Sequence, residues 1–264
     1  GMAMVGVNQG TNILINIFFN VVVNAAVGVA NQVRSAVFGF VSSFQTAFNP
    51  QIVKLYALEE KDQLLLLIYR SSKFSYYLLF IISFPIVLFC KEVLSIWLVN
   101  VPDYAVVITQ LVIITSFTEA LSAPLWTAIG ATGKVQKYQL LVSLIIFLNV
   151  PLVYVAFKLG MSPIAAFVIN FVVSVFAYLY RLLYIKKYVP YHLGDYLKKV
   201  VLPCVIVTVL SFPIPYIFRE YAISAISTIL LLVLTIVVTG IVILLTGLDT
   251  VSYTHLTLPT NSLV

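Results

Sequence analysis

The chain has 264 residues, of which 62% are hydrophobic and 9% are charged, and its mean hydropathy is +1.09. A soluble domain carries about 25% charged residues, so this composition excludes a soluble globular protein and indicates a polytopic membrane protein. The net charge of +6 does not indicate a nucleic-acid-binding protein, because the basic residues lie between apolar segments rather than in one patch.

Eight segments of the chain are apolar over the roughly 20 residues that a helix needs to cross a bilayer. They cover approximately residues 2–20, 22–47, 74–97, 104–130, 138–157, 163–185, 200–218 and 222–246. The predicted fold is therefore all-α with eight transmembrane helices. The first segment is rich in Asn and Gln, and no basic region precedes it, so we interpret it as a span rather than a signal peptide.

The basic residues are distributed unevenly between the two sides of these spans. Eleven lie in the connections at 49–73, 131–137 and 181–199, whereas the alternate connections hold Lys91, Lys158 and Arg219. Lys and Arg are enriched in cytoplasmic loops. We therefore predict that the first span starts in the cytoplasm and that the eighth span ends there.

The long connection after the second span mixes apolar and charged residues at helical spacing. This pattern is typical of an amphipathic helix that lies in the membrane interface. We predict such a helix over about residues 50–72. A partner-binding segment is the alternative interpretation.

Polar residues form a stripe on each of the first two spans. On the first span, Asn8, Asn12 and Asn16 are spaced four residues apart, with Gln9 beside them. On the second span, the stripe consists of Asn24, Asn31, Ser35, Ser42 and Thr46, flanked by Gln45 and Arg34. Polar side chains in hydrocarbon usually face a bundle interior or a wet cavity. Hydrogen bonding between helices explains one stripe equally well, but two adjacent stripes and a charge favour a solvated central cavity.

Two ionisable residues lie well inside predicted spans. Arg34 is near the middle of the second span, and its guanidinium can bind a phosphate or carboxylate with two parallel hydrogen bonds. A structural ion pair is the alternative role. Glu119, in the fourth span, could pair with Arg34, carry a coupling H⁺ or Na⁺ ion, or cap a helix break near Pro124.

The prolines, cysteines and His192 add little to the interpretation of a membrane protein with a solvated cavity. Prolines lie within or at the ends of spans at Pro85, Pro124, Pro151, Pro203, Pro213 and Pro215, where they tend to bend helices. Bent helices suit a transporter and also occur in inert bundles. Cys90 and Cys204 are expected to be apolar filler, and His192 a solvated interfacial residue. The sequence carries no phosphate-binding glycine loop, nucleophile elbow or metal-spaced His and Cys cluster, so we do not predict an enzyme or a bound cofactor.

Several segments resemble one family of bacterial transporters. "NQGTNILINIFFN", "NAAVGVANQVRSAVFGFVSSFQTAFNPQIVKLYA", "RSSKFSYYLL" and "ATGKVQKYQ" are similar to the second half of polysaccharide-repeat flippases of the Wzx type, which belong to the multidrug/oligosaccharidyl-lipid/polysaccharide superfamily. The similarity covers nearly all of residues 1–249, and its motifs are most specific in the first 75 residues.

The resemblance implies a MATE-like architecture of two lobes with six helices each and two extra C-terminal helices. Residues 1–185 would then be the C-terminal lobe, residues 186–249 the extra pair, and the eight spans the seventh to fourteenth of the complete protein. We therefore expect the chain to be a fragment that lacks its N-terminal lobe.

The resemblance also implies a function. The complete protein would move an undecaprenyl-pyrophosphate-linked oligosaccharide across the bacterial plasma membrane by alternating access, alongside a polysaccharide polymerase and glycosyltransferases. The residues expected to line the substrate cavity are Arg34, Asn8, Gln9, Asn12, Asn16 and Asn31. Arg34 would attract the pyrophosphate, and the amides would bind sugars. Glu119 as an ion-coupling site is supported by analogy alone.

Two other functions compete with this one. A drug/cation antiporter of the MATE type has the same fold and prefers acidic residues in its cavity, and one Arg with one Glu inside the membrane does not exclude it. A membrane oligosaccharide polymerase or ligase would have a large external loop, whereas no predicted external connection exceeds about a dozen residues.

The C-terminal residues 250–264, ending in "VSYTHLTLPTNSLV", differ in composition from the spans before them. Residues 251–260 resemble the translation of a tagmentation sequencing adapter over ten consecutive codons, and the adapter frame accounts for the final residue and stop. We therefore interpret residues 250–264 as an artefactual tail and assign no role to His255.

Overall fold

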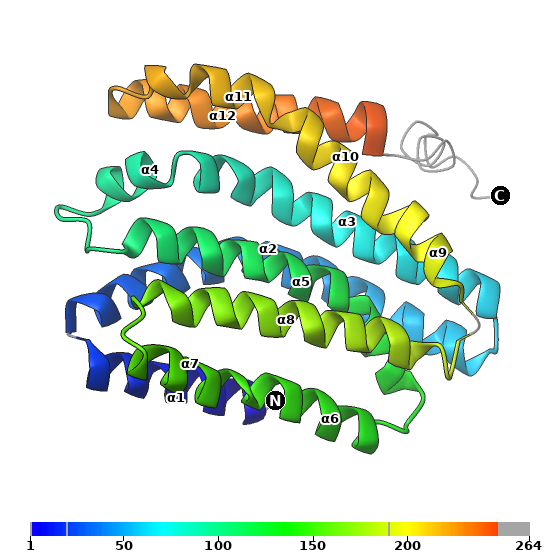
Figure 1. Ribbon diagram of the computed structural model, residues 1–264. Coiled ribbons are helices and arrows are strands. Elements are labelled where there is room, and N and C mark those ends of the chain that lie inside the picture. The colour runs from blue at the N-terminus through cyan, green and yellow to red at the C-terminus, as the bar shows by residue number, and fades with distance from the viewer. Residues whose placement is uncertain (1, 20, 190, 248–264) are drawn as a thin grey trace.

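The chain folds into a bundle of long helices that lie roughly side by side (Figure 1). The computed structural model describes residues 2–19, 21–189 and 191–247, and no strand occurs among them. Seven helical segments of this part of the chain are long and apolar enough to cross a membrane. The protein is thus an all-α, polytopic membrane protein, as predicted.

The helices follow one another with short connections. The first half of the chain contains α1 (Met2–Phe18), α2 (Val21–Ala57), α3 (Lys61–Leu88), α4 (Cys90–Trp97) and α5 (Ala105–Ala131). The second half begins with α6 (Gln136–Phe147), α7 (Asn149–Lys158), α8 (Ile164–Ile185), α9 (Leu193–Tyr196) and the π-helix η1 (Leu197–Val201). The last elements are α10 (Leu202–Ser211), α11 (Pro213–Ile217), the 3₁₀-helix η2 (Phe218–Tyr221), α12 (Ala225–Val242) and the π-helix η3 (Ile243–Gly247).

The predicted count of eight spans is not confirmed. Seven predicted segments coincide with the seven long apolar helical segments, of which the first is α2 and the last combines α12 with most of η3. The segment predicted over 2–20 forms α1, which has 17 residues and is thus shorter than the roughly 20 residues that span a bilayer. The predicted tail at 250–264, with His255, lies outside the described residues.

The separate interfacial helix predicted over about 50–72 is absent from the described structure. Instead, α2 continues to Ala57 without a break at Pro50, and after a short turn with Glu59 in the left-handed region (φ 58°) α3 begins at Lys61. The 37 residues of α2 extend about 55 Å at about 1.5 Å per residue, well beyond the roughly 30 Å hydrocarbon core. The charged, helical pattern therefore belongs to the ends of two long helices.

Prolines account for three interruptions of the predicted spans. A proline has no backbone N–H, so the carbonyl four residues before it loses its helical partner. For Pro151 that carbonyl belongs to Phe147, the last residue of α6, and the chain resumes as α7. Pro213 begins α11 directly after the break at Phe212, and Pro203 follows the π-helical turn η1.

The long helices are arranged around α5, which packs against α2, α3 and α8. On one side of this group lie α1, α6 and α7, and on the other lie α10, α11 and α12, which reach the rest of the bundle mainly through α3 (Figure 1). The side formed by α1, α2, α5, α6 and α8 is the one that matters for function, because a polar cavity lies between these helices.

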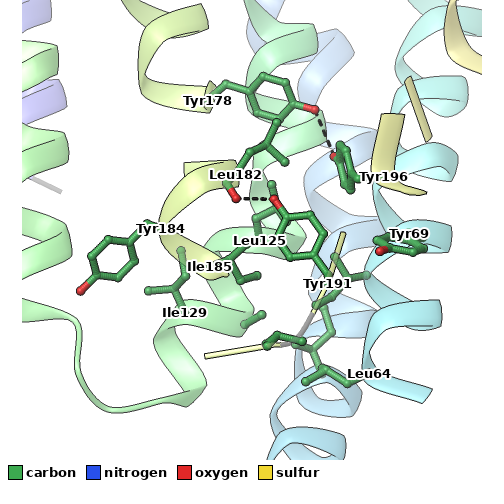
Figure 2. Packing of buried hydrophobic residues seen from close by; sticks show 14 of the residues in the cluster. Leu64, Tyr69, Leu125, Ile129, Tyr178, Leu182, Tyr184, Ile185, Tyr191 and Tyr196 are labelled. Carbon is green, nitrogen blue, oxygen red and sulfur yellow. Dashed lines mark hydrogen bonds between the residues drawn. The ribbon is translucent and has the colours of Figure 1, made fainter. Parts of the chain in front are cut away.

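One end of the bundle is held together by buried aromatic rings, shown in part in Figure 2. We call the six buried tyrosines there the tyrosine cluster: Tyr69, Tyr138, Tyr178, Tyr184, Tyr191 and Tyr196. The Tyr178 hydroxyl donates a hydrogen bond to the Tyr196 hydroxyl at 3.1 Å, and the Tyr191 hydroxyl donates to the Leu182 carbonyl. The cluster thus ties the end of α8 to α3 and to the segment that leads into α10.

Tyr191→Phe is expected to destabilise this end of the bundle. Burial, with Tyr196 and Tyr69 nearby, raises the pKa of Tyr191, so its hydroxyl stays protonated and donates to the Leu182 carbonyl. Removing that donor should cost about 1–2 kcal/mol, measured as a lower midpoint of thermal unfolding in detergent. Tyr221→Phe is the matched control, since Tyr221 is 64% exposed. Equal midpoints for the two variants would contradict the assignment.

Candidate functional site

A cavity of about 350 Å³ lies between α1, α2, α5, α6 and α8. Two of these helices contribute polar residues with the same spacing. Asn8, Thr11 and Asn12 line the cavity from α1. Asn31, Arg34 and Ser35 line it from α2. Residues at i, i+3 and i+4 share one face of a helix, so each polar stripe turns toward the same space.

A second hollow of about 350 Å³ adjoins the first and is more open. Asn12 and Asn31 line both hollows, and Gln9, Asn16 and Asn24 line the second alone. Asn24 donates a side-chain hydrogen bond to Asn16, which joins α1 to α2. The structure therefore places all six predicted cavity residues around two connected hollows.

The other end of the α2 stripe does not reach the cavity. The Thr46 hydroxyl donates to the Ser42 carbonyl at 2.8 Å, and both residues are exposed. Gln45 is buried and donates through Nε2 to the Ala120 carbonyl at 3.1 Å. Gln45 thus joins α2 to α5, as the interpretation of hydrogen bonding between helices predicts, whereas Thr46 bonds within its own helix.

Arg34 and Glu119 form an ion pair at the cavity wall. One terminal nitrogen of the Arg34 guanidinium donates to Glu119 Oε2, and Arg34 Nε donates to the Ser116 hydroxyl at 3.2 Å. The guanidinium also lies 5.4 Å from the ring centroid of Phe38. Of the roles considered for Glu119, pairing with Arg34 is the one the structure shows. Both side chains stay accessible from the cavity, at 30% exposure for Arg34 and 25% for Glu119.

The pairing leaves hydrogen-bonding capacity for a ligand. A guanidinium has five N–H donors, and the hydrogen bonds to Ser116 and Glu119 use two of them. Charge compensation by Glu119 makes this part of the wall nearly neutral. It can therefore orient a polar or anionic group by hydrogen bonding, with little net electrostatic attraction.

A chain of amides crosses the cavity wall and was not predicted. Asn149, which is 1% exposed, accepts a hydrogen bond from the Thr11 hydroxyl at 3.4 Å. Its own amide nitrogen donates to Asn170 Oδ1 at 3.5 Å. This chain joins α1 to α8 through α7. Asn149 is the one Asn of its predicted span and does not share the four-residue spacing of Gln139 and Ser143, so the sequence offered no repeating pattern to identify it.

The third polar face of the cavity comes from α8 and was also missed. Asn170, Ser174 and Arg181 line the cavity at spacings of four and seven residues, which place them on one helix face. We had counted Arg181 among the charges of a cytoplasmic connection. The structure places it in the last turns of α8, within the span predicted over 163–185, and shows that it lines the cavity. The spacing of these three residues was the available signal.

The remaining candidate residues lie away from the cavity. Cys90 and Cys204 are free, buried thiols in two different apolar clusters, and His192 is exposed before α9. The residues that the structure describes contain no group of three or more His, Cys, Asp or Glu side chains placed to hold a metal ion.

No protein-family model, curated protein or solved structure matches this chain. The class of protein is therefore defined by the structure itself. It is an all-α, polytopic membrane protein whose polar and charged side chains converge on a cavity within the bundle. The resemblance to polysaccharide-repeat flippases stays a prediction.

Glu119→Gln is expected to lower the stability of the bundle by about 1–3 kcal/mol, because it leaves a half-buried Arg34 without its carboxylate. Arg34→Gln should cost a similar amount. In the double variant the two neutral amides can bond to each other, so the combined loss should be clearly smaller than the sum. Thermal unfolding of the four proteins in detergent measures this coupling. Additive losses would show that the ion pair contributes nothing to stability.

Proposed function

We propose that this chain forms the C-terminal lobe of a flippase that moves undecaprenyl-pyrophosphate-linked oligosaccharide repeat units across the bacterial plasma membrane. The observation that carries the proposal is the polar face shared by α1 and α2. Asn8, Gln9, Asn16 and Asn31 are exposed although they lie on helices of a membrane bundle. Exposed amides are costly in lipid, so this face is suited to water, sugar and a second lobe.

The chemistry of the face fits an amphiphile with a sugar head. Amide side chains both donate and accept hydrogen bonds, which matches the many hydroxyl groups of an oligosaccharide. Arg34 has donors left for a pyrophosphate oxygen, and Arg binds phosphates with two parallel hydrogen bonds. The apolar outer surface of the helices leaves the lipid tail in the bilayer.

The size of the cavity supports the need for a second lobe. Pockets for drug-sized ligands measure roughly 300–1,000 Å³, so a cavity of about 350 Å³ holds a few sugar rings at most. Opposed to a similar N-terminal lobe, the α1 and α2 faces would enclose a larger central space. Rocking of the two lobes would open that space alternately to each side, and H⁺ or Na⁺ could drive the cycle.

The proposed topology follows from the distribution of basic residues. The tyrosine cluster and the connections rich in Lys and Arg would face the cytoplasm, where lipid-linked repeat units are assembled. With α1 as a further span the chain would cross the membrane eight times, with both ends of residues 1–249 on the cytoplasmic side. Glycosyltransferases and a polysaccharide polymerase are the expected functional neighbours.

Arg34→Ala should reduce export of surface polysaccharide by about tenfold or more, because a charge-assisted contact to the pyrophosphate is lost. The measurement uses the complete protein in a bacterial strain that lacks its own repeat-unit flippase. Lys54→Ala is the matched control, since Lys54 is an exposed cation of the same helix away from the cavity. Unchanged export by Arg34→Ala at normal protein levels would refute the headgroup role.

A drug/cation antiporter remains the second candidate, and the Glu119 carboxylate in the cavity wall favours it. Such a transporter needs a carboxylate that exchanges a proton or sodium ion for an organic cation. Glu119→Gln would then abolish efflux of a fluorescent cation such as ethidium. For a flippase the same change should leave most polysaccharide export intact, because Gln still accepts a hydrogen bond from Arg34. The two activities therefore separate the candidates.

A further inference from the structure

The cavity contains a second cation at the end nearest the tyrosine cluster. Arg181 lines the cavity from the last turns of α8, on the same face as Asn170 and Ser174. Asn170 and Arg181 are eleven residues apart, which corresponds to about 16 Å along a helix axis. Arg181 thus lies deep toward one end of the cavity, at a different level from the amide chain through Asn170.

Arg34 and Arg181 differ in how their charges are compensated. Arg34 forms a salt bridge with Glu119, whereas Arg181 forms none with a described residue. No described carboxylate therefore lies within salt-bridge distance of Arg181. Glu119 is also the single acidic residue among those lining the cavity. The net positive charge of the cavity is thus concentrated at Arg181.

Two buried polar atoms at this end have no hydrogen-bond partner among the described residues. They are Nε of Arg181 and the hydroxyl oxygen of Tyr138, whose side chain is 1% exposed. The two side chains are neighbours, and the guanidinium of Arg181 is close enough to interact electrostatically with the Tyr138 hydroxyl. Buried polar groups are nearly always paired. Arg181 lines the cavity, and its terminal guanidinium nitrogens can donate hydrogen bonds to an acceptor that enters there. Tyr138 lies behind Arg181, outside the residues that line the cavity, and supports the guanidinium from the protein side.

An anion satisfies these groups better than a neutral ligand. An unpaired buried charge is costly, and a guanidinium presents a planar fork of donors that matches the oxygens of a phosphate group. A neutral sugar hydroxyl could fill the hydrogen bonds but would leave the charge of Arg181 uncompensated. The arrangement therefore favours a ligand with a negatively charged, oxygen-rich group.

We propose that Arg181, assisted by the Tyr138 hydroxyl, forms a phosphate-binding position at the tyrosine-cluster end of the cavity, separate from the Arg34–Glu119 pair. The identity of the ligand as the pyrophosphate of a lipid-linked sugar rests on the proposed function. In the proposed topology this end faces the cytoplasm. Arg181 is then the residue that the headgroup meets on loading, and Arg34 contacts it deeper in the membrane.

The test measures binding of inorganic pyrophosphate to the purified full chain in a maltoside detergent, which contributes no phosphate of its own. Titration calorimetry at low ionic strength should detect binding to the unaltered chain. Arg181→Gln should weaken binding by about tenfold or more, and Tyr138→Phe by a smaller factor. Arg181→Lys keeps the charge without the fork and should fall between the unaltered chain and Arg181→Gln.

Lys186→Gln is the matched control, because Lys186 is an exposed cation directly after α8 that does not line the cavity. It should bind pyrophosphate as the unaltered chain does. The proposal is overturned if the folded chain binds no pyrophosphate, or if Arg181→Gln and Lys186→Gln change affinity equally. Should Arg181→Gln fail to fold, Arg181→Lys and Tyr138→Phe carry the comparison.

The outcome is independent of the flippase assignment. Suppose that pyrophosphate binding depends on Arg181 but the complete protein exports no polysaccharide. That result would support the anion site and contradict the proposed function. If the complete protein exports polysaccharide and Arg181→Gln binds pyrophosphate normally, the result would support the proposed function and contradict the anion site.

Discussion

The cost of leaving a polar group unpaired in hydrocarbon governs this structure. Every backbone N–H and C=O at membrane depth must find a partner within the protein, which is why the described residues that cross the bundle are helical. The same cost acts on side chains. Many of the amides, hydroxyls and charges of α1, α2, α5 and α8 turn toward one another or toward a shared cavity, while many Leu, Ile and Val side chains are exposed on the outside. The candidate site thus forms where the bundle places polar side chains away from the lipid.

The two arginines that line the cavity differ in their ion pairing. Arg34 is paired with Glu119 and held by Ser116, so its position is fixed and its charge is largely cancelled. Arg181 has no carboxylate partner among the described residues and sits against the tyrosine cluster. A neutral, well-anchored donor can select for shape, whereas an uncompensated cation attracts charge. The cavity is therefore nearly neutral at Arg34 and positively charged at Arg181.

The sequence predicted the features that repeat and missed those that stand alone. Asn8, Asn12 and Asn16 recur every four residues in an apolar context, and this periodicity placed them on one face. Asn149 is the single amide of α7, and its role depends on α1 and α8 coming together. Arg181 lies where the predicted span over 163–185 overlaps the basic connection at 181–199, so it was counted as a topology charge and not as a cavity residue. Span boundaries were also blurred, since the sequence did not reveal that α2 continues through Pro50.

The joint between α6 and α7 lies between the two ends of the bundle, and backbone hydrogen bonds from Leu148 N to Leu144 O and from Leu152 N to Leu148 O continue across it. On one side of Leu148, α6 contributes Tyr138 and Val142 to the apolar cluster that contains the tyrosines. On the other side, α7 contributes Val153 and Phe157 to the cluster at the opposite end. Pro151 removes the one backbone hydrogen bond that the Phe147 carbonyl would accept, so the joint is less stiff than an unbroken helix while each half stays packed in its own cluster. In the proposed alternating-access cycle, such a joint would let one end of the cavity rearrange without straining the other.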